Sequence, residues 1–325
     1  SSHFASSSPG QTMLRGFAWL FVLGLHSINA GPVCQAEGQC DATSSRTDTY
    51  FWPTAHGGKH YGNSPYIGPF NLSTSVAWSW AHPDGQYHDM PLGTAIDDKS
   101  NVYVSANNGI WKLNEEGKML WSFLPGFAPG ESGNLNPDGA CLYDGAVFFG
   151  TVDGRFFSVD METGRMIWSR KAAGFGCMDT GFVVVYAGVM LAEVDPAGSR
   201  WDNMCATILA LNSSDGSELW RYKPLDVMWN LMPQYLDDGT FVFQDITGKT
   251  YRNNAFTGAL VWKQGGWAGS WTDGTQGLGP NGIVYGVNTN GCSGPNCHGK
   301  LTAFKVSDGT QLWQNDVPRP PNSSP

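Results

Sequence analysis

The chain has 325 residues, of which 41% are hydrophobic and 14% are charged, and it contains 42 glycines and 14 tryptophans. This composition, without long helical periodicities, is typical of an all-β domain with many tight turns. The 19 basic and 28 acidic residues give a formal net charge of −9, which argues against nucleic acid or an anionic membrane surface as the main partner.

The first 49 residues are expected to lie outside the folded domain. Residues 1–12 are Ser-rich and precede the first methionine, so we treat them as an upstream or non-native segment. Residues 13–30 combine Arg15, the apolar run 17–25 and the small residue Ala30, which predicts a secretory signal peptide. A signal anchor is the alternative, but a span needs about 20 apolar residues. Residues 31–49 are a polar linker, and we expect a secreted or luminal protein without a further membrane segment.

Five β-hairpins follow, each with a glycine at the end of its turn and a tryptophan four residues later. In residues 154–168, Phe157 and Val159 alternate as strand residues do, residues 162–164 turn, and residues 166–168 return. Glycine closes the turn because it adopts positive φ without a steric cost, and tryptophan adds a large apolar plate. The five pairs are Gly117/Trp121, Gly164/Trp168, Gly216/Trp220, Gly258/Trp262 and Gly309/Trp313.

Short strands rich in β-branched and aromatic residues precede the hairpins, so that each repeat has four strands. They are residues 101–105, 145–150, 182–187 with 189–192, 240–243 and 282–286. The tryptophans recur every 42 residues (Trp220 to Trp262) to 52 residues (Trp168 to Trp220). Four-stranded repeats of this length indicate the blades of a β-propeller, and a β-sandwich with chance tryptophan spacing is the alternative.

The strand predicted over residues 75–80 carries Trp78 but has no hairpin glycine before it, because Thr74 stands at that position. An isolated outer strand at the start of a propeller closes the ring onto the last blade and removes an exposed sheet edge. We therefore expect residues 75–80 to be such a strand.

Residues 157–168 and 209–220 resemble the tryptophan-docking repeat of the PQQ-like propellers, roughly aromatic-x-Ala-Leu-Asp-x-x-Thr-Gly-x-x-x-Trp. The segment around Trp52-Pro53 and Ser64-Pro65 is similar to the start of the quinoprotein domain. This superfamily includes quinoprotein alcohol dehydrogenases and the outer-membrane assembly factor BamB. The resemblance covers residues 50–325 and implies a ring of seven or eight blades, so we expect five to six blades of a C-terminally truncated domain. Residues 251–254 of the fourth repeat depart from the pattern, because they are more polar.

Two repeats carry inserts between the second strand and the tryptophan hairpin, at residues 194–203 and 289–298. Equivalent positions of repeats fall on one face, so both inserts should lie at the same end as the connections 124–134, 174–180, 224–233 and 265–275. Their aromatic and charged side chains could hold a planar or sugar ligand. The alternative is that they cap the core and turn the chain. These side chains are Asp179, Asp195, Arg200, Trp201, Asp202, Trp229, Trp267 and Trp271.

In the quinoprotein enzymes, the resemblance implies, pyrroloquinoline quinone (PQQ) lies over a tryptophan, and calcium and an aspartate base assist removal of the alcohol proton. Candidates are Asp179 and Asp273 for catalysis, and Trp229, Trp267, Trp271, Arg200 and Trp201 for cofactor binding. The sequence has neither a Cys-Cys pair nor a heme-attachment CxxCH. We predict a binding or scaffold module that recognises a protein or a small planar or sugar ligand. A PQQ-dependent oxidoreductase of alcohols or sugars is the alternative.

Secretion permits disulfides. We expect the pairs Cys34/Cys40, Cys292/Cys297 and Cys177/Cys205, which leave Cys141 odd. Sequons at Asn71, Asn212 and Asn322 predict surface glycosylation.

The histidines give a weak signal for a metal. His56, His60, His82 and the pair His88-Asp89 could chelate an ion, but no CxxC pair or helical HExxH motif supports it. We therefore expect no metal site.

Overall fold

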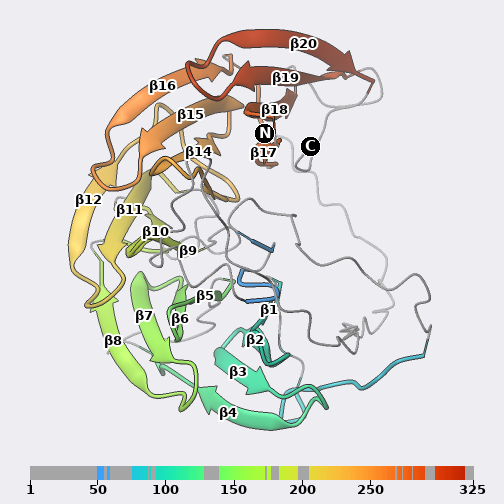
Figure 1. Ribbon diagram of the computed structural model, residues 1–325, viewed down its shortest axis with the longest axis vertical. Coiled ribbons are helices and arrows are strands. Elements are labelled where there is room, and N and C mark those ends of the chain that lie inside the picture. Colours follow the sequence, from blue (N-terminus) through green and yellow to red (C-terminus); the bar gives the residue numbers. More distant parts are fainter. Residues whose placement is uncertain are drawn as a thin grey trace, which may run out of the picture.

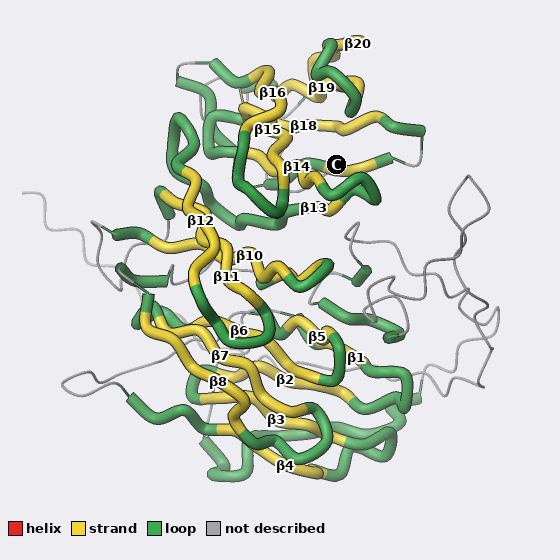
Figure 2. The backbone as a smooth tube through the Cα atoms, turned by 60° about the vertical axis from the view of Figure 1, so that its left-hand side comes forward, coloured by secondary structure: helices red, strands yellow, loops and turns green. Residues whose placement is uncertain are grey.

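The computed structural model describes residues 50–54, 57–58, 75–86, 88, 93–127, 139–172, 174–176, 183–196, 205–267, 269–272, 274–279, 281–289 and 297–318. These residues form twenty β-strands in five four-stranded sheets. The sheets follow one another in chain order along an arc, with the first strand of each sheet inside and the last outside (Figure 1). Seen from the side, they stack one beside the next (Figure 2).

The strands of each sheet are consecutive in the chain and antiparallel. The first sheet has β1 (Ala95–Ile96), β2 (Val102–Ala106), β3 (Gly109–Leu113) and β4 (Met119–Phe123), and the second has β5 (Cys141–Tyr143), β6 (Ala146–Gly150), β7 (Arg155–Asp160) and β8 (Met166–Lys171). The third has β9 (Val184–Tyr186), β10 (Val189–Val194), β11 (Thr207–Asn212) and β12 (Glu218–Tyr222), and the fourth has β13 (Gln234–Tyr235), β14 (Thr240–Gln244), β15 (Lys249–Asn254) and β16 (Leu260–Gly265). The fifth has β17 (Gly277–Leu278), β18 (Ile283–Thr289), β19 (Gly299–Lys305) and β20 (Gln311–Val317).

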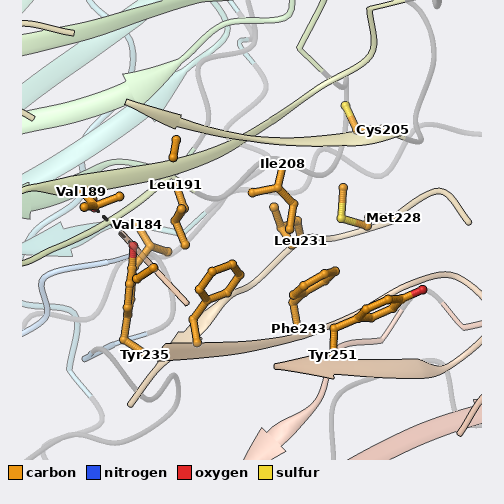
Figure 3. Close-up of a cluster of buried hydrophobic side chains, with 13 residues drawn as sticks. Val184, Val189, Leu191, Cys205, Ile208, Met228, Leu231, Tyr235, Phe243 and Tyr251 are labelled. Atoms are coloured by element: carbon orange, nitrogen blue, oxygen red, sulfur yellow. Dashed lines mark hydrogen bonds between the residues drawn. The ribbon is translucent and has the colours of Figure 1, made fainter. Parts of the chain in front are cut away.

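The hydrophobic core lies between neighbouring sheets. One cluster joins Val189, Leu191 and Ile208 of the third sheet to Tyr235 and Phe243 of the fourth, and Figure 3 shows these side chains facing one another. Similar clusters lie between the second and third sheets and between the first and second. Middle strands such as β2, β3 and β6 are therefore buried along their whole length. A two-layer sandwich has one core, so the sandwich alternative is wrong and the propeller is confirmed.

Each interface between sheets is fastened by an indole that lies on the hairpin glycine of the next sheet. A Cβ atom added to Gly164 would stand 2.8 Å from Cδ2 of Trp121. The Trp121 Nε1–H donates a hydrogen bond to the Met161 carbonyl in the same hairpin turn, 3.1 Å away. Because Gly164 has φ +67°, it both opens the turn and leaves room for the ring.

The same contact occurs at the other three interfaces between sheets and where residues 75–80 meet the first sheet. Trp78 lies on Gly117, Trp168 on Gly216, Trp220 on Gly258 and Trp262 on Gly309, and a Cβ atom added to each glycine would stand 2.6 to 2.8 Å from the nearest ring atom. Each indole Nε1 also donates to a carbonyl of the following turn, namely Glu115, Ser213, Ala255 and Val306. Trp313 has no following turn within the described residues and is 38% exposed. The five predicted glycine and tryptophan pairs are thus the structural repeat.

The polar residues 251–254 of the fourth repeat include a second group, besides Trp262, that hydrogen-bonds to the fifth sheet. The buried Arg252 guanidinium donates to the carbonyls of Val306, at 2.9 Å, and Ser307, at 3.1 Å. Lys112 stands at the equivalent position in the first sheet, opposite Trp121, and its Nζ donates to the Met161 carbonyl at 2.8 Å. In both sheets a cation therefore reinforces the indole that binds the same carbonyl.

One element differs from the prediction. Residues 75–80 are not part of a hydrogen-bonded strand. A strand needs a ladder partner, and no described strand pairs with this segment. Trp78 nevertheless occupies its docking position on Gly117, so the segment keeps its place in the packing without forming a sheet.

Candidate functional site

The turns between the second and third strands of each sheet and the connections between sheets lie at one end of the structure, which we call the loop face. Asp195, in one predicted insert, is hydrogen-bonded to Phe175 of a connection, and Thr289, where the other insert starts, donates its N–H to the Trp271 carbonyl at 2.8 Å. The N–H of Thr272 donates to the Ile246 carbonyl at 2.7 Å. Inserts, turns and connections are thus joined into one rim.

Three of the predicted ligand-binding tryptophans lie on this rim. Trp229 and Trp267 are half-buried, and Trp271 is 38% exposed. Backbone hydrogen bonds position Trp267 and Trp271, because the Ser270 N–H donates to the Trp267 carbonyl and Thr289 binds the Trp271 carbonyl. Asp179, Arg200, Trp201, Asp202 and Asp273 lie outside the described residues, so a quinone site built from them stays a prediction.

The described cysteines are either disulfide-bonded or free. Cys205 and Cys297 are disulfide-bonded. Their predicted partners Cys177 and Cys292, like Cys34 and Cys40, lie outside the described residues, so the pairing stays a prediction. Cys141 is a free, fully buried thiol beside the Val185 N–H, and burial raises its pKa to about 12.

Of the three sequons, the described residues contain Asn212, while Asn71 and Asn322 lie outside them. Asn212 is half-buried at the end of β11. Its side-chain oxygen accepts hydrogen bonds from the Ser214 N–H at 2.9 Å and the Ser214 hydroxyl at 2.8 Å. Glycosylation at all three sequons stays a prediction.

The outer strands β4, β8, β12, β16 and β20 carry a feature that sequence reasoning missed. In every sheet the residue before the docking tryptophan is a bulge, because Trp121 pairs with Lys112 and Met119 with Leu113, which leaves Leu120 without a ladder partner. The bulge residue is always apolar and half-exposed: Leu120 (49%), Ile167 (52%), Leu219 (44%), Val261 (50%) and Leu312 (48%). We call these five side chains the bulge belt. In the sequence, each can be found as the apolar residue directly before the docking tryptophan.

A second group missed from the sequence lies in the connection before β1. His82, Asp84 and His88 bring their ligand atoms within 4.8 Å of one another. The backbone N–H of Gln86, followed by the two histidines, lowers the pKa of the Asp84 carboxyl to about 2. The sequence pattern indicates His82 and His88 but pairs them with Asp89, which lies outside the described residues.

Five four-stranded sheets, each fastened to the next by an indole on a hairpin glycine, define a tryptophan-docked β-propeller. The family model described as "Outer membrane protein assembly factor BamB" matches residues 75–191 and again residues 205–322. These two matches cover most of the chain, which therefore belongs to this family of PQQ-like propeller proteins. Within the described residues, no helix is long and apolar enough to cross a membrane.

Similar proteins include both enzymes and an assembly factor. Quinoprotein alcohol dehydrogenase PedH of Pseudomonas putida is 28% identical over 213 residues, which are 61% of this chain and 33% of PedH. Outer membrane protein assembly factor BamB of Legionella pneumophila (strain Paris) is 31% identical over 128 residues, 38% of this chain and 31% of that protein. The crystal structure of BamB from Moraxella catarrhalis is 15% identical with a TM-score of 0.46, covering 70% of this chain and 76% of that one. The matched region thus spans about a third of the curated relatives.

Proposed function

We propose that this propeller is a binding or scaffold module that holds a protein partner against its outer strands. The observation that supports the proposal is the bulge belt, one apolar side chain per sheet at the same position. Fully burying a side chain of this size contributes about 1.5–3 kcal/mol, and each of these is already half covered. Several contacts of about 1 kcal/mol, repeated along one surface, suffice for a specific interface.

The bulges also indicate how the partner binds. A bulge disrupts the ladder and twists the strand, which protects an edge strand from pairing with another chain. At the bulges the partner therefore contacts side chains, rather than adding a strand to the sheet. An apolar partner surface fits this geometry.

Crosslinking and substitution test whether the partner binds the outer strands or the loop face. The full-length protein would carry a photo-crosslinking amino acid at Ile167 or Leu219, or at Trp271 on the loop face. We expect an adduct of one defined mass from Ile167 and Leu219. With the purified partner, the double substitution Ile167→Ser and Leu219→Ser should weaken binding by more than about tenfold, two lost contacts of about 1 kcal/mol each. Loss of binding on Trp271→Ser, with the bulge variants unaffected, would place the interface on the loop face instead.

We further propose that the protein is exported and works in an oxidising compartment. The predicted signal peptide at residues 13–30 and the disulfide-bonded Cys205 and Cys297 support this. Mass spectrometry of the protein isolated from its native compartment, with and without reduction, tests it. Free Cys205 and Cys297 in the isolated protein would contradict export.

The second candidate is a PQQ-dependent oxidoreductase of an alcohol or sugar, favoured by the similarity to quinoprotein dehydrogenases such as PedH. Trp271, exposed on the loop face, is the described residue best placed to contact a planar cofactor. Titration of the full-length protein with PQQ and calcium, followed by dye reduction with alcohols, tests this function. Saturable uptake with turnover supports the enzyme, and the absence of both supports the scaffold.

A further inference from the structure

The group formed by His82, Asp84 and His88 is held between the first sheet and the segment that carries Trp78 and Trp80. The His82 ring is 4.7 Å from the Trp111 ring, edge to face, and 6.2 Å from that of Trp80. The Nδ1 atom of His88 contacts the side-chain oxygen of Asn107, which lies in the turn between β2 and β3. The group therefore joins the connection before β1 to the turn between β2 and β3 at the loop face.

One carboxylate faces both imidazoles. His82 Nδ1 lies 2.7 Å from Asp84 Oδ1, and His88 Nε2 lies 2.7 Å from Asp84 Oδ2. Each of these ring nitrogens can either donate a hydrogen to the carboxylate or offer its lone pair to an ion. His88 Nδ1 lies against the side-chain oxygen of Asn107, to which its N–H form can donate. Two imidazoles and one carboxylate thus meet at one place, with their ligand atoms within 4.8 Å of one another.

The two imidazoles lie against each other and are largely shielded from water. The side chains of His82 and His88 are 9% and 16% exposed, and their ring centroids are 3.6 Å apart. In addition, His82 Nε2 is buried without a hydrogen-bond partner. The buried His82 ring is consequently held through one nitrogen alone.

A divalent cation can bind among these three groups. It would take the lone pairs of His82 Nδ1 and His88 Nε2 and one oxygen of Asp84, in place of the two shared hydrogens. His88 Nδ1–H would continue to donate to Asn107, as metal-bound histidines donate their other N–H to an oxygen acceptor. Tetrahedral ligand atoms about 2.0–2.1 Å from zinc are about 3.3 Å apart, a separation that lies between the 2.7 Å nitrogen–oxygen distances and the 4.8 Å upper limit for the group.

We propose that His82, Asp84 and His88 bind a divalent transition-metal ion of the zinc class, with water completing its coordination. Two imidazoles and a carboxylate are the donors that zinc accepts in protein sites, and three protein ligands leave a fourth position open. Among the described residues this is the one group of three or more such side chains that meets. The site goes beyond the proposed partner binding and is independent of it, and it revises our expectation from the sequence.

The experiment uses the chelator-treated full-length protein, titrated by calorimetry with Zn²⁺ and by absorbance with Co²⁺, which reports the coordination geometry. We expect one equivalent of ion with four-coordinate cobalt bands. The variants His82→Gln, Asp84→Asn and His88→Gln should each lose this binding. Asn107→Ala should weaken it by about 10–100-fold, as expected for a residue that orients a ligand.

His298→Gln is the matched control, because His298 is an exposed histidine outside the group, and it should bind as the unchanged protein does. Circular dichroism without metal shows whether each variant is folded, and the cobalt spectrum of the unchanged protein tests the site without any variant. An unchanged protein that binds no ion, or a folded His82→Gln/His88→Gln variant that keeps its equivalent, overturns the proposal.

Discussion

Substituting Gly164 with alanine should measure the indole contact between the first and second sheets. Two costs are expected in the folded protein. Gly164 has φ +67°, and an L-residue in this region costs about 1–2 kcal/mol. The new Cβ would also stand 2.8 Å from Trp121, and overpacking of this kind costs about 1–3 kcal/mol. Together they lower the free energy of unfolding by about 2–5 kcal/mol.

Gly145, in the same sheet, provides the matched control. It has φ +78°, but a Cβ there would have no heavy atom within 4 Å. Gly145→Ala therefore carries only the backbone cost of about 1–2 kcal/mol. The difference between the two alanine variants is the cost of crowding the indole of Trp121.

Urea unfolding, followed by tryptophan fluorescence and by circular dichroism, measures both variants, and coincident transitions justify a two-state treatment. A double-mutant cycle with Trp121→Ala then removes the crowded ring, and we expect a coupling of at least about 0.5 kcal/mol between positions 121 and 164. Equal losses for Gly164→Ala and Gly145→Ala, with no coupling in the cycle, would refute the docking of the indole on the glycine.

Three further predictions follow from buried or hydrogen-bonded polar groups. Arg252→Met should lower the free energy of unfolding by about 2–3 kcal/mol, because it removes the hydrogen bonds of the buried guanidinium to the Val306 and Ser307 carbonyls, of which Val306 keeps only the Trp262 indole as a donor. Arg252→Lys should lose less, since Lys112 makes the equivalent bond in the first sheet, and urea unfolding of both variants measures the difference. The Cys141 thiol, buried and with its pKa raised to about 12, should resist alkylation in the native protein and react in denaturant, so that native labelling seen by mass spectrometry would contradict its burial. The Thr163 hydroxyl and N–H lower the pKa of Asp160, so this carboxylate stabilises the fold above its unfolded pKa and loses that contribution as pH falls through the folded pKa. Thr163→Val should therefore reduce the fall in the free energy of unfolding between neutral pH and about pH 3. A fall of unchanged size would contradict the assignment.

Much of the fold is readable from the sequence because its signals are local. A glycine in a tight turn and an aromatic residue on the return strand, as at Gly164 and Trp168, lie in one hairpin and repeat at blade length. The partner of each ring is less evident, since Trp168 contacts Gly216 of the next sheet rather than its own glycine. Contacts between repeats depend on how sheets pack, which local spacing does not specify.

The candidate sites are harder to predict for the same reason. The bulge at Leu120 becomes visible only when the register of β3 and β4 is known. Asp84 joins His82 and His88 because the connection folds back beside the Asn107 turn, whereas the sequence places Asp89 next to His88. The strand expected at residues 75–80 does not form, because none of the described strands pairs with it and strand propensity cannot replace a ladder partner.

The proposed metal site lies at the interface that differs most from the others. Trp121, Trp168, Trp220 and Trp262 project from sheet strands, whose ladders hold the indoles on the next sheet. Trp78 projects from a segment without a ladder in the described residues, yet it lies on Gly117 in the same way. His82 follows this segment directly and packs edge to face against Trp80 and Trp111. It reaches the first sheet through His88 and Asn107. An ion bound there would fasten the segment to the first sheet, and so supply the order that ladder hydrogen bonds supply at the other four interfaces.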